Sequence, residues 1–185
     1  MDMSSWGPLG HLAGSWAGDQ GLDVSHSYSK GGTKENPYRE EVSFDPFGPV
    51  DNGTQSLYGL DYRMKAWRIG EDEPFHMEVG YWLWDAERNL VMRCFMVPRG
   101  VSIFAAGEAG ADARSFHLSA EKGEETFGIL QNPYLMKAAR TTDYEVSIAI
   151  AKDGTSFSYA EDTVLEMQVQ PGVYHHTDRN TLKKV

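Results

Sequence analysis

Short stretches of alternating apolar and polar residues follow one another along most of the chain. From residue 38 onward, groups of Gly, Pro, Asp and Asn interrupt the alternation at short intervals. A period of two predicts strands with one buried face, and turn signals at such spacing indicate an antiparallel all-β fold. The expected strands span residues 38–44, 54–67, 75–84, 90–97, 101–108, 113–120, 138–151, 156–168 and 174–182.

The segments between these strands predict connections and caps. Residues 3–13 indicate a short helical or 3₁₀ turn, and residues 132–134 could open another. Residues 22–36 lack periodicity and are rich in Ser, Gly, Lys and Asn, which is typical of a mobile surface loop. The Asp-Pro-Phe-Gly-Pro sequence at 45–49 predicts the end of a strand. Asp153-Gly154 is a strong hairpin signal between two long strands.

With the glycine-flanked segment 14–18 added, about ten strands predict one closed antiparallel up-and-down barrel that covers residues 1–185 as a single domain. In such a meander the last strand pairs with the first, so we expect residues 14–18 to pair with residues 174–184. Trp16 should then close one end of the barrel, with Arg179 stacked over it. A barrel of this size can hold one small ligand.

Composition narrows the possible partners. The 185 residues carry a formal net charge of -10, which argues against nucleic acid or an anionic membrane as the partner. The single cysteine excludes an intramolecular disulfide, and no apolar run approaches the roughly 18 residues of a membrane span. We therefore expect a soluble cytoplasmic protein without membrane insertion, and keep a homodimer among the possible assemblies.

Two adjacent histidines in the last expected strand are candidate ligands of a metal centre. Strand alternation lets only one of His175 and His176 face the barrel interior, and a bulge near Gly172 would exchange the two. A metal-bound imidazole needs an acceptor for its other nitrogen, for which Asp178 is a candidate, and the alternative interpretation is a solvated edge strand with two surface histidines.

Several pieces of the sequence resemble the nitrobindin family, heme-binding β-barrels related in shape to fatty-acid-binding proteins and lipocalins, in a bacterial branch. The pieces are Gly14-Ser15-Trp16-Ala17-Gly18, Tyr38-Arg39-Glu40-Glu41-Val42-Ser43-Phe44, Gly80-Tyr81-Trp82-Leu83-Trp84-Asp85, Pro98-Arg99-Gly100, and the spacing Tyr159…Met167…His176…Leu182.

This resemblance implies a ten-stranded barrel that holds heme b through one C-terminal histidine. By position, His176 matches the iron ligand. The activities implied are nitric oxide binding and isomerisation of peroxynitrite to nitrate, so the resemblance makes the chain a possible peroxynitrite isomerase if heme is bound. Further expected contacts to the cofactor are His76, Met167 and Tyr159 as cavity lining and Arg99 as a partner of a heme propionate.

Two other functions fit the same fold. One is a cofactor-free carrier of an apolar small molecule such as a lipid. The other is a barrel enzyme with acid–base chemistry from His76, Glu78 or Tyr81. The sequence contains no nucleophile elbow, no His-Glu-x-x-His and no phosphate-binding glycine loop.

Overall fold

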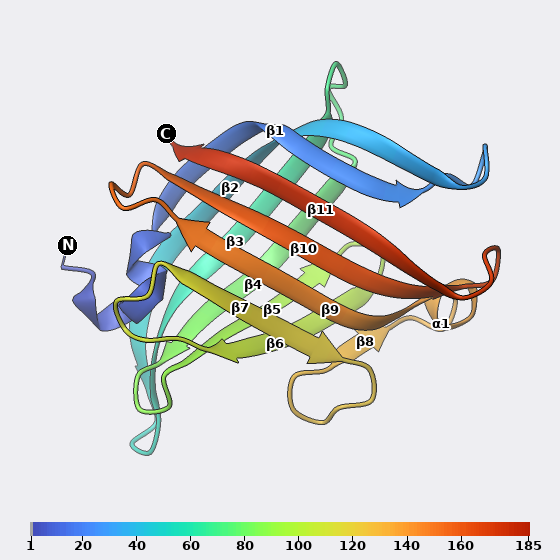
Figure 1. Ribbon diagram of the computed structural model, residues 1–185. Coiled ribbons are helices and arrows are strands. Elements are labelled where there is room, and N and C mark those ends of the chain that lie inside the picture. Colours follow the sequence, from blue (N-terminus) through green and yellow to red (C-terminus); the bar gives the residue numbers. More distant parts are fainter. Residues whose placement is uncertain (1) are drawn as a thin grey trace.

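Residues 2–185 are described by a computed structural model, and within them eleven β-strands form one antiparallel sheet that closes into a barrel (Figure 1). The strands are β1 (Gly14–His26), β2 (Thr33–Asp51), β3 (Ser56–Arg68), β4 (His76–Asp85), β5 (Leu90–Val97), β6 (Val101–Glu108), β7 (Ser115–Glu121), β8 (Ile129–Gln131), β9 (Ala139–Ile150), β10 (Ser156–Met167) and β11 (Val173–Lys184). A 3₁₀ helix, η1 (Ser4–His11), precedes them, and a short helix, α1 (Leu135–Ala138), precedes β9. The expected all-β barrel with a short N-terminal helical turn is confirmed.

The barrel closes where the first strand meets the last. β1 runs antiparallel to β11, with Trp16 opposite Lys184 and Ala17 opposite Lys183, as the meander order predicted. On the other side of the ring β5 pairs with β6 over its whole length. The three-residue β8 lies beside β6 and outside the meander order. Ten long strands therefore form the wall.

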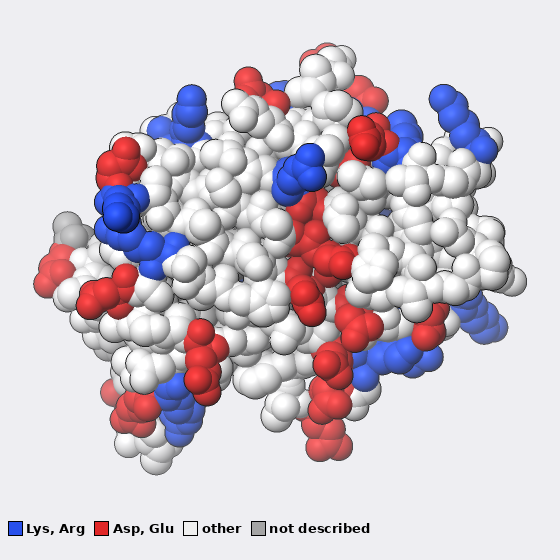
Figure 2. All heavy atoms as spheres, in the orientation of Figure 1, with Lys and Arg blue, Asp and Glu red and all other residues white. Residues whose placement is uncertain are grey.

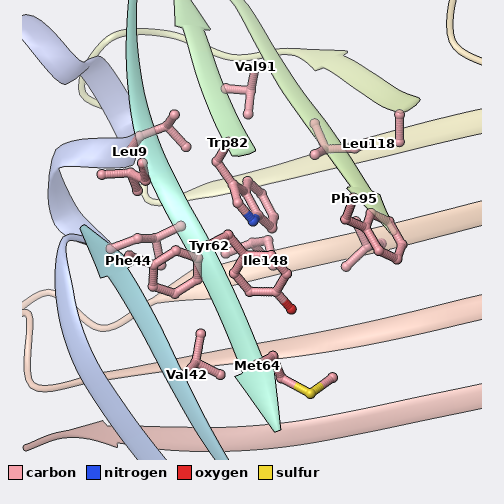
Figure 3. Packing of buried hydrophobic residues seen from close by; sticks show 14 of the residues in the cluster. Leu9, Val42, Phe44, Tyr62, Met64, Trp82, Val91, Phe95, Leu118 and Ile148 are labelled. Atoms are coloured by element: carbon pink, nitrogen blue, oxygen red, sulfur yellow. The ribbon is translucent and has the colours of Figure 1, made fainter. Parts of the chain in front are cut away.

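The apolar core fills the end of the barrel that η1 covers. Trp16 is fully buried, its Nε1 donates to the Leu12 carbonyl oxygen at 2.6 Å, and its ring meets Phe157 edge-on at 5.0 Å. Figure 3 shows Phe44, Tyr62 and Trp82 converging beneath Leu9 of η1. A cavity lies at the other end, and its lining includes Tyr28 of the β1–β2 connection and Leu135 of α1. Figure 1 shows both segments at the end of the barrel away from η1.

The expected stacking of Arg179 over Trp16 is wrong. The register of β1 and β11 places Lys184 opposite Trp16, and the Lys184 Nζ lies 5.1 Å from the indole centroid. Arg179 is exposed and lies opposite Leu22 instead.

The mobile loop expected at residues 22–36 is also wrong for most of its length, since β1 continues to His26 and β2 begins at Thr33. Asp23 and Asn36 lie opposite each other and point inward, and the Asn36 Nδ2 donates to the Asp23 Oδ2 at 2.6 Å. Ser25 donates to the same oxygen at 2.8 Å. Because the inward side chains of these strand ends are polar, the sequence shows no alternation of apolar and polar residues there.

The turn expected at 45–49 does not end β2. The strand continues to Asp51 through a register shift between Phe47 and Val50, where Gly48 adopts a φ of 121°. Pro46 and Pro49 have no N–H to donate, so ladder pairing is irregular there while the chain stays extended. Neither helix among residues 2–185 is long and apolar enough to cross a bilayer.

Candidate functional site

Two cavities that share lining residues occupy the barrel, and the smaller one lies within the apolar core. The larger one, the mouth cavity, has a volume of about 380 Å³ and is lined by Asp23, Arg68, His76, Arg99, Met167 and His176 among others. The smaller one, the inner cavity, has a volume of about 30 Å³ and is lined by Glu40, Tyr62, Trp82, Arg93 and Tyr159 among others. Glu78, Glu161 and Asp178 line both and form the floor of the mouth cavity.

His176 faces the mouth cavity, and His175 faces outward. On β11 the side chains of Tyr174, His176 and Asp178 point inward, as the alternation allows for one histidine only. The His176 Nε2 lies 2.5 Å from the Asp23 Oδ1 on the neighbouring strand β1. The Nδ1 of His176 has no hydrogen-bond partner in residues 2–185 and is accessible. The imidazole is thus fixed by a carboxylate and offers its other nitrogen.

Asp23 is a carboxylate suited to this role. Burial alone would raise its pKa, but hydrogen bonds from His176, Ser25 and Asn36 outweigh burial and lower the pKa. Asp23 therefore stays ionised and acts as an acceptor for the imidazole N–H. Asp178, the acceptor proposed from the sequence, instead accepts from the Tyr38 hydroxyl.

The outward histidine belongs to an acidic outer surface. The His175 Nδ1 lies 2.6 Å from the Asp162 Oδ2, and Asp162 lies opposite Glu145 on β9. Figure 2 shows acidic side chains gathered in a band across the face formed by β9, β10 and β11. His175 is therefore separated from the cavity by the barrel wall.

Asp178 belongs to a buried chain of hydroxyl and carboxyl groups. The Tyr38 and Tyr159 hydroxyls lie 2.7 Å apart, and Tyr159 donates to the Glu40 Oε2 at 2.9 Å. Asn180 donates to the same oxygen at 2.8 Å. Burial raises the pKa of Glu40 to about 7, since these donors offset only part of its effect. Burial and the neighbouring Glu161 raise the pKa of Asp178 well above its usual range.

Arg93 on β5 is the central cation of the interior. Only 4% of the residue is exposed, and its guanidinium lies 2.5 Å from the Glu78 Oε2 and 2.9 Å from the Glu161 Oε2. Tyr62 and Tyr144 complete this cluster, donating to Glu78 at 2.8 Å and to Glu161 at 2.6 Å. Burial would raise the pKa of Glu78, but Arg93 and His76 lower it to about 2.

The structure brings four of the five expected site residues to the mouth cavity. His76 and His176 face it, Met167 is a buried part of its wall, and Arg99 is exposed at its rim. Tyr159 lies deeper, in the inner cavity. Tyr81, named as an acid–base candidate, is on the outer wall, where 48% of it is exposed.

Sequence reasoning missed Arg93, Glu40 and Glu161. A signal for Arg93 was present, because it stands between Val91 and Phe95 on the inward face of an otherwise apolar strand. Among residues 2–185, no group of three or more His, Cys, Asp or Glu side chains is arranged to hold a metal ion.

The comparisons with known proteins agree with this architecture. The family description "THAP4-like, heme-binding beta-barrel domain" matches residues 5–184. No curated protein sequence matches the chain. Among solved structures, the crystal structure of Rv2717c from M. tuberculosis superposes with a TM-score of 0.66 at 22% identity, over 96% of this chain and 94% of that one. At this identity the likeness shows the fold alone. The match over nearly all of the sequence establishes that the chain belongs to the THAP4-like, nitrobindin-like family of heme-binding β-barrel domains.

Proposed function

We propose that the mouth cavity binds heme b and that His176 is the protein's ligand to its iron. The observation that carries the proposal is the His176 imidazole itself. It faces the cavity, its Nε2 is engaged by Asp23, and its Nδ1 is accessible and without a partner in residues 2–185. An iron-ligating histidine commonly has its other nitrogen hydrogen-bonded to a carboxylate, carbonyl or water.

The rest of the mouth cavity fits an amphipathic ring. Its walls include apolar side chains from several strands, namely Phe95, Val97, Ile103, Leu165 and Met167. Arg68 and Arg99 supply positive charge among the lining residues, and Arg99 is exposed at the rim. Arg99 would hold a heme propionate there, because guanidinium groups bind carboxylates through paired hydrogen bonds.

The activities proposed for the loaded protein are nitric oxide binding and isomerisation of peroxynitrite to nitrate. When bound, heme supplies an iron centre with coordination positions for such small molecules. The chain's own residues contribute orientation and exclusion of water. Asp23 fixes the His176 ring, and the apolar walls limit water access to the cavity.

The inner cavity does not favour a carrier of fatty acids. Such a ligand needs a cation for its carboxylate, but Arg93 is already engaged by Glu78 and Glu161. Glu40 and Asp178 add two further carboxyl groups to the lining. A carboxylate placed there would lie among carboxyl groups, two of which already pair with the terminal nitrogens of Arg93.

Replacing His176 tests the proposal. The His176→Ala variant should abolish or strongly shift the Soret band of the hemin-reconstituted protein, since only apolar contacts and rim charges remain to hold the ring. His175→Ala is the matched control, because it removes the adjacent imidazole from the outer wall, and its Soret band should match that of the unmodified protein.

Circular dichroism and melting curves of both apo variants show whether each is folded. A folded His176→Ala variant with an unchanged Soret band would contradict the ligand assignment. Unmodified protein that takes up no hemin would falsify the function and leave an apolar carrier as the better account.

A further inference from the structure

His76 lies across the mouth cavity from His176. It begins β4, and in the closed ring β4 is separated from β11 by β1, β2 and β3 on one side and by five strands on the other. Both side chains line the same cavity. A molecule in this cavity therefore has an imidazole on each of two nearly opposite walls.

A buried carboxylate holds the His76 ring. The His76 Nε2 lies 3.1 Å from the Glu78 Oε1. The other oxygen of Glu78 accepts from the Tyr62 hydroxyl at 2.8 Å and from the Arg93 guanidinium at 2.5 Å. A base oriented by a carboxylate that is itself fixed by further donors is an arrangement found behind many acid–base histidines.

The second ring nitrogen is free to act on a ligand. The His76 Nδ1 has no hydrogen-bond partner in the part of the chain that the structure describes, and it is accessible. The side chain is 32% exposed and lines the mouth cavity. Arg93, by comparison, does not line the mouth cavity, and its two terminal guanidinium nitrogens pair with Glu78 and Glu161.

The charges around His76 favour its protonated form. Glu78 faces it from its own strand, Glu161 from β10 and Asp178 from β11, while Arg68 on β3 lines the same cavity. Burial alone would lower the pKa of His76, but the hydrogen bond and charge of Glu78, together with Glu161 and Asp178, outweigh burial and raise the pKa. The imidazolium then has an Nδ1–H to donate into the cavity.

We propose that His76 binds small anions in the mouth cavity by donating its Nδ1–H to them, on the side opposite His176. The inference rests on the proposed heme function, because the anion would be held between His76 and the bound cofactor. The ligand class is a small monovalent anion, such as azide or the conjugate base of another weak acid. If the weak acid HX enters while His76 is neutral, its proton moves to the Nδ1, and X⁻ remains beside the imidazolium.

Azide binding to the hemin-loaded protein tests this role through the shift of the Soret band at a series of pH values. The hydrogen bond from His76 is present below its pKa and is lost as the pH rises through that value. His76→Gln should weaken azide binding roughly 10- to 100-fold at low pH, the range expected for losing a charge-assisted hydrogen bond, and should flatten the pH dependence. His175→Gln removes a histidine outside the cavity and should leave affinity and pH profile unchanged.

A histidine-selective NMR titration of the apo protein provides a readout that does not depend on heme. His76 should titrate above the ordinary histidine value, and Glu78→Gln should bring its pKa down. A His76 that titrates at or below the ordinary value overturns the inference, as does a His76→Gln variant that takes up hemin and binds azide like the unmodified protein. A hemin-loaded spectrum that loses a second imidazole ligand in His76→Gln also overturns it, since His76 would then ligate the iron directly. Failure of the unmodified protein to take up hemin would instead refute the proposed function.

Discussion

At the scale of single residues, the two ends of the barrel differ in what their buried side chains do. Trp16 at the η1 end is 1% exposed and contacts Phe157 and the Leu12 carbonyl. Arg93, farther in, is just as deeply enclosed but engages carboxylates. Removing one partner of a buried charge pair is costly, whereas removing an apolar ring leaves a void. An apolar residue such as Trp16 therefore supports the fold, whereas a charged residue such as Arg93 shapes the site.

Trp16→Ala should lower the free energy of unfolding by about 3–5 kcal/mol, the usual loss for a buried tryptophan replaced by alanine. Urea denaturation of the apo protein measures this change. Tyr134→Ala is the control, because 70% of Tyr134 is exposed and its loss should have little effect. A Trp16→Ala variant with normal stability and lost hemin affinity would mean that Trp16 serves the ligand and not the fold.

At the scale of elements, close packing between strands explains several glycines. Gly107 on β6 faces β7, and a Cβ at this position would lie 1.9 Å from the His117 carbonyl oxygen. β6 and β7 are joined there by the pairing of Ala106 with Ser119. A side chain at 107 would push the two strands apart at this point.

Gly107→Ala should therefore destabilise the protein by about 1–3 kcal/mol, as overpacking commonly does. Gly110→Ala is a matched control, since a Cβ there would meet nothing within 4 Å. Thermal melting followed by circular dichroism compares the two variants. Equal melting temperatures of the two variants would show that β6 and β7 can move apart at this point without loss of stability.

The elements that the sequence predicts well are those whose inward side chains are apolar. β5 and β6 begin and end at the predicted residues because their inward positions include Val91, Phe95 and Ile103. The strand ends around Asp23 and Asn36 were missed because their inward side chains pair with each other by hydrogen bonds. The candidate site follows the same division. Strand alternation predicted that only one of His175 and His176 faces inward, and the family resemblance selected His176. The role of Arg93 depends instead on carboxylates from β4 and β10 that only the closed ring brings together.

At the scale of the whole molecule, the interior carboxyl groups make stability depend on pH. Glu40 has a pKa of about 7 in the folded protein, against 4.5 as its ordinary value. Below pH 4.5 it is protonated in both the folded and unfolded states. Between pH 4.5 and 7 the unfolded state releases the proton first, so stability falls as the pH rises. The raised pKa of Asp178 likewise makes stability fall as the pH rises. The lowered pKa of Glu78, about 2, has the opposite effect, because stability then falls as the pH drops below 4.5.

Glu40→Gln should reduce this loss of stability between pH 4.5 and 7 by about 3 kcal/mol, because the neutral amide does not titrate. Urea denaturation across this pH range gives the comparison. Glu41→Gln, at the adjacent exposed position with 65% of its side chain accessible, should retain the pH dependence of the unmodified protein. Parallel curves for Glu40→Gln and the unmodified protein would place the titrating group elsewhere.

The seam between β1 and β11 joins segments that lie near the opposite ends of the chain. Closing so long a loop has a large entropic cost, and pairings between distant segments make barrels slow to fold, while hairpins such as β9–β10 need only local contacts. The same seam contains the contact between Asp23 and His176. The proposed iron ligand thus acquires its orientation only when the ring closes. The time course of hemin capture during refolding would therefore report when the barrel closes.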